Sequence, residues 1–140
     1  MSERITIKSA HDGKKLELSW SEPHESVTNY VRVWVTGLRC DVSADVDLYM
    51  SEPLPKFFQS LADSWRGWEG EKHWASLEGE LRLSASIDHT GHIKLRIHLK
   101  SGHYTYDWRL ETALELEVGQ LDALAQEMSR FFANKKTEEV

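Results

Sequence analysis

The sequence predicts an α+β fold, in which an antiparallel meander sheet of about seven strands carries two helices packed on one face. Over most of the 140 residues, apolar and polar side chains alternate. This period of two is typical of strands with one buried face. Two segments instead show the apolar spacing of an amphipathic helix. The predicted order is therefore four strands, a helix, three strands and a helix.

Four strands joined as hairpins are expected in the first half of the chain. They cover residues 5–7, 16–20, 30–35 and 40–48. Asp12-Gly13 between the first two is a typical hairpin turn, and Gly37-Leu38 fits a two-residue turn between the next two. The second turn would pair Val35 with Cys40, which places both side chains on the apolar face.

A helix is expected after the fourth strand. Its apolar residues fall at helical spacing on one side: Leu54, Phe57, Phe58, Leu61, Ala62 and Trp65. Ser51 suits the N-cap and Pro53 the first turn. Residues 66–75 show neither period and contain two glycines, so they are expected to form a loop.

A second meander and a final helix complete the predicted fold. The strands cover residues 77–87, 93–99 and 104–116, and the helix begins near residue 121. Asp88 to Gly91 would form a turn that pairs Ile87 with Ile93. A turn at Ser101-Gly102 would pair Leu95 with Trp108 and Arg96 with Asp107.

A single domain over residues 1–134 is expected, followed by a flexible tail at 135–140. The strand-to-helix unit occurs twice, which suggests an internal duplication. The competing interpretation is that any two amphipathic helices show this spacing.

Composition excludes several classes of protein. There are 17 Lys and Arg against 23 Asp and Glu, a formal charge of −6, which disfavours nucleic acid as the main partner. No apolar stretch is long enough for a membrane span, and the N-terminus lacks a signal peptide. The single cysteine, Cys40, excludes an internal disulfide and fits a reducing cytoplasm.

No metal site, cofactor or catalytic centre is predicted. The seven histidines lack the spacing and the companion ligands of a metal site. Phosphate-binding glycine loops, nucleophile elbows and helical zinc motifs are absent. The sequence therefore favours a non-enzymatic protein.

Partner-binding candidates come from the polar sheet face and from the six tryptophans. They are Trp34, Trp68, Trp74, Arg96 and Asp107. Tryptophan and arginine are enriched at interface hot spots. Two less specific interpretations stay open: a solvated face of weak ion pairs, and a loop that folds its own tryptophans over the sheet edge.

The run Trp65-Arg-Gly-Trp-Glu-Gly-Glu-Lys-His-Trp74 resembles a family of small bacterial proteins known only as a domain of unknown function. The residues that carry the resemblance follow the pattern W-R-G-W-x-G-x-K-x-W. It implies a bacterial cytoplasmic protein and supplies no activity or ligand. Some members of such families look like immunity proteins that neutralise toxins, which is an analogy of fold only.

The leading hypothesis is a protein-interaction module that uses the open sheet face and the Trp68 to Trp74 loop. Its partner could be a basic toxin domain attracted by the net charge. The alternative is a small-ligand-binding domain with a site between the helices and the strand that carries Tyr104, Tyr106 and Trp108. A third interpretation is a homo-oligomer assembled through sheet edges or faces.

Overall fold

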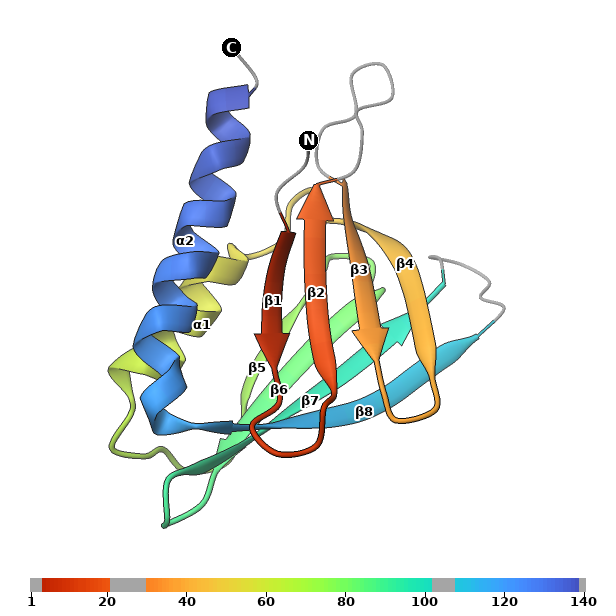
Figure 1. The fold of residues 1–140 in the computed structure, drawn as a ribbon. Helices are drawn as coiled ribbons and strands as arrows, with labels where there is room; N and C mark the ends of the chain where they lie inside the picture. Colours follow the sequence, from red (N-terminus) through yellow and green to blue (C-terminus); the bar gives the residue numbers. More distant parts are fainter. Residues whose placement is uncertain (1–3, 21–29, 102–107, 139–140) are drawn as a thin grey trace.

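A computed structural model describes residues 4–20, 30–101 and 108–138 (Figure 1). The first sheet contains β1 (Arg4–Lys8), β2 (Lys15–Trp20), β3 (Tyr30–Thr36) and β4 (Asp41–Asp47), and helix α1 (Leu54–Asp63) follows it. The second sheet contains β5 (Lys72–Ala75), β6 (Leu81–Ile87), β7 (His92–Lys100) and β8 (Arg109–Glu117). A short 3-10 turn (Val118–Gln120) then leads into helix α2 (Leu121–Glu138). The predicted α+β class with two helices is confirmed.

The strands form two antiparallel sheets, in the orders β1-β2-β3-β4 and β5-β6-β7-β8. The expected single meander of about seven strands is corrected in this respect. Strand β5 lies within the segment predicted to be a loop, because a four-residue strand is too short to display a clear alternation. The topology ββββα thus occurs twice, whereas hydrophobic periodicity carries no information on which strands share a sheet.

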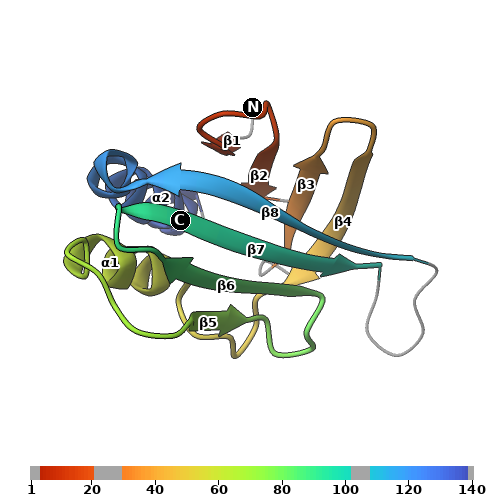
Figure 2. The ribbon, with the colours of Figure 1, turned by 90° about the horizontal axis from the view of Figure 1, so that it is seen from below.

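The two sheets pack with their apolar faces inward. Their strands cross at a steep angle, and both helices lie together at one side of the sheets (Figures 1 and 2). The buried hydrophobic residues of both sheets and both helices form a single cluster. One face of each sheet is therefore in the core, and no helix or strand of the described residues lies over the other face (Figures 1 and 2).

The helices bury the faces that their spacing predicted. In α1, Leu54, Phe57, Phe58, Leu61 and Ala62 are buried. In α2, Leu121, Leu124, Ala125, Met128 and Phe131 are buried. The rings of Phe131 and Trp20 on β2 stack with centroids 5.2 Å apart. Helix α2 extends to Glu138, so it includes residues 135–138, which the sequence assigned to a tail.

One predicted strand register is confirmed and two are wrong. Ile87 pairs with Ile93 as expected. Val35 pairs with Val42 rather than Cys40, because Gly37 N–H donates to Cys40 O and closes a longer turn. Cys40 is consequently exposed. A shift of two residues keeps every side chain on its own face, so the alternation does not reveal it.

The observed register between β7 and β8 also differs from the predicted one, by a larger even number of residues. Leu95 pairs with Leu114, and Arg96 pairs with Ala113. The predicted pairings of Leu95 with Trp108 and of Arg96 with Asp107 are therefore wrong. Asp107, like Tyr104 and Tyr106, lies outside the described residues.

Polar links join the two sheets at opposite sides. On one side, Ala10 N–H donates to Glu115 O at 2.7 Å, and Lys14 Nζ donates to Ala113 O at 3.1 Å. On the other, the Glu80 carboxylate accepts hydrogen bonds from the Ser76 hydroxyl at 2.8 Å and from Asp47 N–H at 3.2 Å. Glu80 is 0% exposed, so this link lies in the interior.

Replacing Glu80 by alanine is expected to destabilise the fold. The Glu80→Ala variant leaves the backbone N–H of Asp47 without its carboxylate acceptor and the buried Ser76 hydroxyl with only the longer bond to Leu81 O at 3.4 Å, which costs about 1–3 kcal/mol. The free energy of unfolding, measured by urea denaturation, should fall by that amount. Glu78→Ala, at an exposed position in the same turn, should change it by less than about 0.5 kcal/mol. Equal stability of the two variants would contradict the role assigned to Glu80.

Candidate functional site

The outer face of the second sheet is open and predominantly basic. Period-two alternation on β6, β7 and β8 sends every second side chain outward. Five lysine and arginine side chains share this face with three glutamates: Arg82, Lys94, Arg96, Lys100 and Arg109, with Glu111, Glu115 and Glu117. The chain as a whole carries a charge of −6. Positive charge is therefore concentrated locally on an acidic protein.

Among these cations, Arg82, Lys94 and Arg96 are exposed and form no ion pair in the part of the chain that the structure describes. The cross-strand neighbours of Arg96 are Ser84 and Ala113. Both are small and uncharged, so they leave its guanidinium group accessible. The neighbouring His98 differs, because its Nδ1 lies 2.9 Å from Oε1 of Glu111.

A groove of about 860 Å³ runs over this face. The second sheet supplies its floor, with Arg82, Lys94 and Arg96 among the lining residues. Lys14, in the turn between β1 and β2, and Glu52, before α1, line its rims. The groove therefore combines residues from both halves of the chain.

Gly79 sets the position of Arg82. It adopts φ +76°, and a Cβ added there would lie 3.0 Å from Nη2 of Arg82. The guanidinium group thus lies against the glycine backbone at the start of β6. A larger residue at position 79 would be strained and would push the arginine away.

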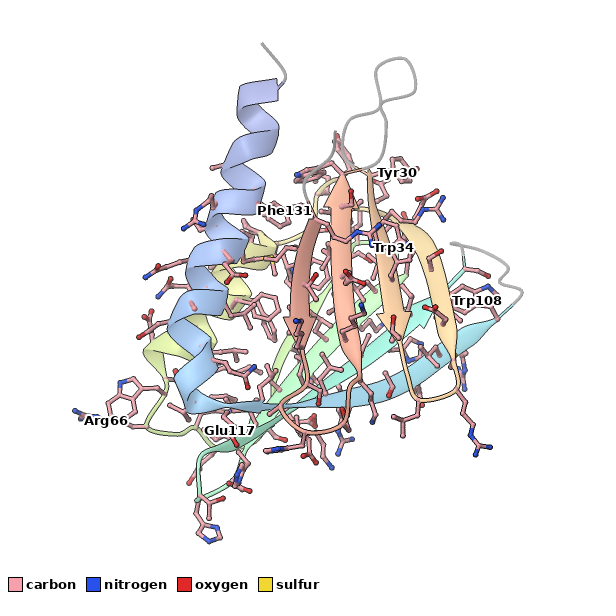
Figure 3. All side chains as sticks on the ribbon, viewed as in Figure 1. Tyr30, Trp34, Arg66, Trp108, Glu117 and Phe131 are labelled. Atoms are coloured by element: carbon pink, nitrogen blue, oxygen red, sulfur yellow. The ribbon has the colours of Figure 1, made fainter. Side chains whose placement is uncertain are left out.

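The Trp-rich segment presents a different tryptophan from those predicted. Trp65 is 52% exposed, and Cζ of Arg66 lies 5.1 Å from its ring centroid. Figure 3 shows Arg66 projecting away from the body of the protein. The helical spacing placed Trp65 in the core, but α1 ends at Asp63. Trp65 therefore lies beyond the helix. The sequence signal for its exposure is that Arg66 and Gly67 follow it directly.

The other two tryptophans of this segment have structural contacts. Trp68 is half-buried, and its Nε1–H donates to Ala85 O at 3.1 Å. Trp74 is only 5% exposed, and its Nε1–H donates to Glu52 O at 2.8 Å. Trp74 is therefore corrected from a surface candidate to a core residue. It faces inward because it lies on the same side of the sheet as its partner, Leu83.

The predicted partner-binding residues do not form one surface. Trp34 lies on the outer face of the first sheet, with Cζ of Arg4 4.0 Å from its ring centroid (Figure 3). Arg96 lies on the outer face of the second sheet. Strand parity predicts that Arg82, Lys94 and Arg96 share the polar face, which the structure confirms, but only Arg96 was chosen from the sequence as a binding candidate.

Two histidines, one from the β1–β2 turn and one from the start of β7, lie close to Glu117. Nε2 of His11 and Nε2 of His92 lie 3.2 Å and 3.9 Å from the same oxygen of Glu117. Within residues 4–20, 30–101 and 108–138, no group of three or more His, Cys, Asp or Glu side chains is arranged to hold a metal ion. These side chains therefore make a polar contact between the β1–β2 turn and the second sheet.

Comparison with known proteins places the chain in a family. A family model described as a family of unknown function (DUF6228) matches residues 7–135, so the chain belongs to this family. The predicted membership of a domain of unknown function is confirmed, while the Trp-Gly pattern and a bacterial source stay predictions. No curated protein and no solved structure matches. Among the described residues, no helix has the length and apolar character needed to cross a bilayer.

Asp88 in the β6–β7 turn is expected to titrate at unusually low pH. The Thr90 hydroxyl donates to its carboxylate at 2.6 Å, and the N–H groups of His92 and Thr90 also donate. These bonds lower the pKa of Asp88 from 3.8 to about 2. Because the folded-state pKa is depressed, the stabilisation is complete above about pH 4 and is lost as the pH falls towards 2.

The Thr90→Val variant tests this assignment. It removes the strongest donor, so the pKa of Asp88 should rise towards 3.8. The pKa should be measured by NMR titration of the side-chain carboxyl carbon in both proteins. An unchanged pKa in Thr90→Val would show that the hydroxyl is not the cause.

Proposed function

We propose that this member of the family is a non-enzymatic protein-interaction module, which binds a protein partner through the basic groove on the second sheet. The observation that supports the proposal most strongly is that Arg82, Lys94 and Arg96 line the groove, exposed and without ion pairs in the described residues. Lys94 and Arg96 are two residues apart on β7, and Arg82 lies diagonally across from Arg96 on β6. These like charges repel one another. Their concentration on one face is most simply explained by a negatively charged partner.

Arginine suits this role better than its charge alone would suggest. The guanidinium group is planar and forms paired hydrogen bonds to carboxylates. Arg96 is the central candidate, because the small neighbours Ser84 and Ala113 leave its guanidinium group open to a partner. The positive charge of the groove argues against a basic toxin domain as the partner at this surface.

Trp65 and Arg66 extend the proposed surface beyond the sheet. They line a second hollow of about 600 Å³ with the residues of the β6–β7 turn. A half-exposed tryptophan beside an arginine is the composition typical of an interface hot spot.

A small anionic ligand is the second candidate. The groove volume of about 860 Å³ lies within the range typical of small-molecule sites. A ligand of this kind would raise the unfolding temperature of the purified protein. Screening carboxylates and phosphates by thermal shift separates this candidate from a protein partner, which would be retained as a larger mass.

The decisive experiment compares Arg96→Glu with Arg39→Glu. Both replace an exposed arginine by glutamate, but Arg39 lies in the β3–β4 turn, on the other sheet. Tagged proteins should be purified at low salt from the native host and measured by native mass spectrometry. A stoichiometric partner is expected with wild type and Arg39→Glu, and not with Arg96→Glu. Equal retention by both variants, or a bare wild-type monomer, would refute the proposal.

Trp65→Ala should separate binding from stability. The exposed ring contributes little to the core, so the unfolding temperature should stay within about 2 °C of wild type. Partner affinity should fall at least about tenfold, measured by titration with the captured partner. Trp74→Ala serves as the contrast, because removing a buried ring should destabilise the fold by about 3–5 kcal/mol. Unchanged affinity in Trp65→Ala would remove this hollow from the binding surface.

A further inference from the structure

The hollows along the second sheet share lining residues with one another. The main groove shares Lys94 with a neighbouring hollow, and that hollow shares Ile87 and Asp88 with the Trp65 hollow. We call this path, from Arg82 to Trp65, the basic track. It follows β6, whose seven residues span about 20 Å. Its length suits an extended segment of six to eight residues, at roughly 3.3 Å for each residue.

The cations along the track follow the repeat of an extended chain. Lys94 and Arg96 are two residues apart on β7, and Arg82 pairs across the strands with His98, two residues further on. Each step is therefore about 6.6 Å along the sheet. A segment in extended conformation presents side chains on one face at the same repeat. Carboxylates at positions i, i+2 and i+4 would each meet one cation.

An exposed apolar patch adjoins the Arg82 end of the track. Leu77 and Met50 are 59% and 72% exposed. They are held near each other because Leu77 N–H donates to Oγ of Ser51 at 3.1 Å. Leu77 belongs to the same turn as Gly79, on which the Arg82 guanidinium lies. An apolar side chain at one end of the bound segment would cover this patch.

We propose that the occupant of the basic track is an extended acidic segment of a partner protein, with carboxylates at alternate positions facing Lys94, Arg96 and Arg82, and an apolar residue against Leu77 and Met50. The proposal rests on the proposed function and names the chemistry of the partner. Charge complementarity favours a peptide over a nucleic acid. Glu111 and Glu115 line the same hollows, so the positive charges are interrupted, which suits separate carboxylates at alternate positions better than the uninterrupted charge of a polyphosphate.

Two peptides of equal composition test the spacing. One is Leu-Ser-Glu-Ser-Glu-Ser-Glu, in which the leucine and all three carboxylates share one face of the extended chain, and the other is Leu-Ser-Glu-Glu-Glu-Ser-Ser, with clustered carboxylates, of which only two share the face of the leucine. Both have blocked termini, and each is titrated into the isotopically labelled full chain and followed by NMR. The alternating peptide should bind about fivefold more tightly, as expected for one additional exposed ion pair. The shifted amide signals should lie on β6, β7 and the residue 76–80 turn.

Variants of the chain provide the second part of the test. The double variant Lys94→Ala/Arg96→Ala should weaken binding of the alternating peptide about 25-fold, by removing two pairs at about fivefold each. Arg39→Ala, the matched control on the other sheet, should leave it unchanged. A circular dichroism spectrum of each variant confirms that the fold is intact.

Three outcomes would overturn the inference: equal affinity for the two peptides, amide shifts on the first sheet, or tighter binding of a single-stranded oligothymidylate at the same ionic strength. Its failure is distinguishable from failure of the proposed function. If neither peptide binds while the captured partner still requires Arg96, only the inference about the acidic segment is wrong. If the captured partner does not require Arg96, both are wrong.

Discussion

Burial of one face of each sheet in a shared apolar cluster is the constraint on which the rest of the structure depends. Successive side chains of a strand point to opposite faces of the sheet. When one face is buried in the core, the side chains of the other face are therefore exposed to solvent. Residues such as Leu18 and Val33 in the first sheet, and Leu95 and Leu114 in the second, are completely buried. Since both helices lie at one side, they leave the outer face of the second sheet uncovered (Figure 2). The position of Lys94 and Arg96 in solvent follows directly from the burial of Leu95 between them.

The binding surface also depends on how the two halves meet. Neither sheet is hydrogen-bonded to the other through a continuous ladder in the described residues. A few polar links fix their relative position, of which the bonds from Lys14 to Ala113 O and from Asp47 N–H to Glu80 are examples. Lys14 is at once a link between the sheets and a lining residue of the groove. Stability and the shape of the surface are therefore coupled at this residue.

Hydrophobic periodicity predicted the elements better than it predicted their pairing. Alternation identified β6 and β7, and a four-residue turn fixed the pairing of Ile87 with Ile93. Between β3 and β4 and between β7 and β8, the true registers differ by even steps, which preserve the faces and leave no trace in the pattern. The division into two sheets is set by tertiary packing, which the local sequence pattern does not reveal.

The candidate surface was predictable only in part, for similar reasons. Arg96 was identified because strand parity alone sends it outward. The predicted pairing of Ile87 with Ile93 already groups it with Arg82 on the same face, whereas the exposure of Trp65 requires knowing that α1 ends at Asp63. Trp74 was misassigned because a short strand between glycines resembles a loop in sequence.

Net charge is a poor guide to the partner of this protein. The total of −6 acts over distances at which physiological salt screens strongly, since the Debye length there is about 8 Å. A partner in contact with the second sheet lies within that distance of Arg82, Lys94 and Arg96, whose charges are not offset by ion pairs in the described residues. The local field therefore decides what binds, and the net charge mainly slows the approach of an acidic partner from afar. An acidic protein with a basic groove would accordingly select partners that place carboxylates at the groove itself, and it would discriminate against those that are merely acidic overall.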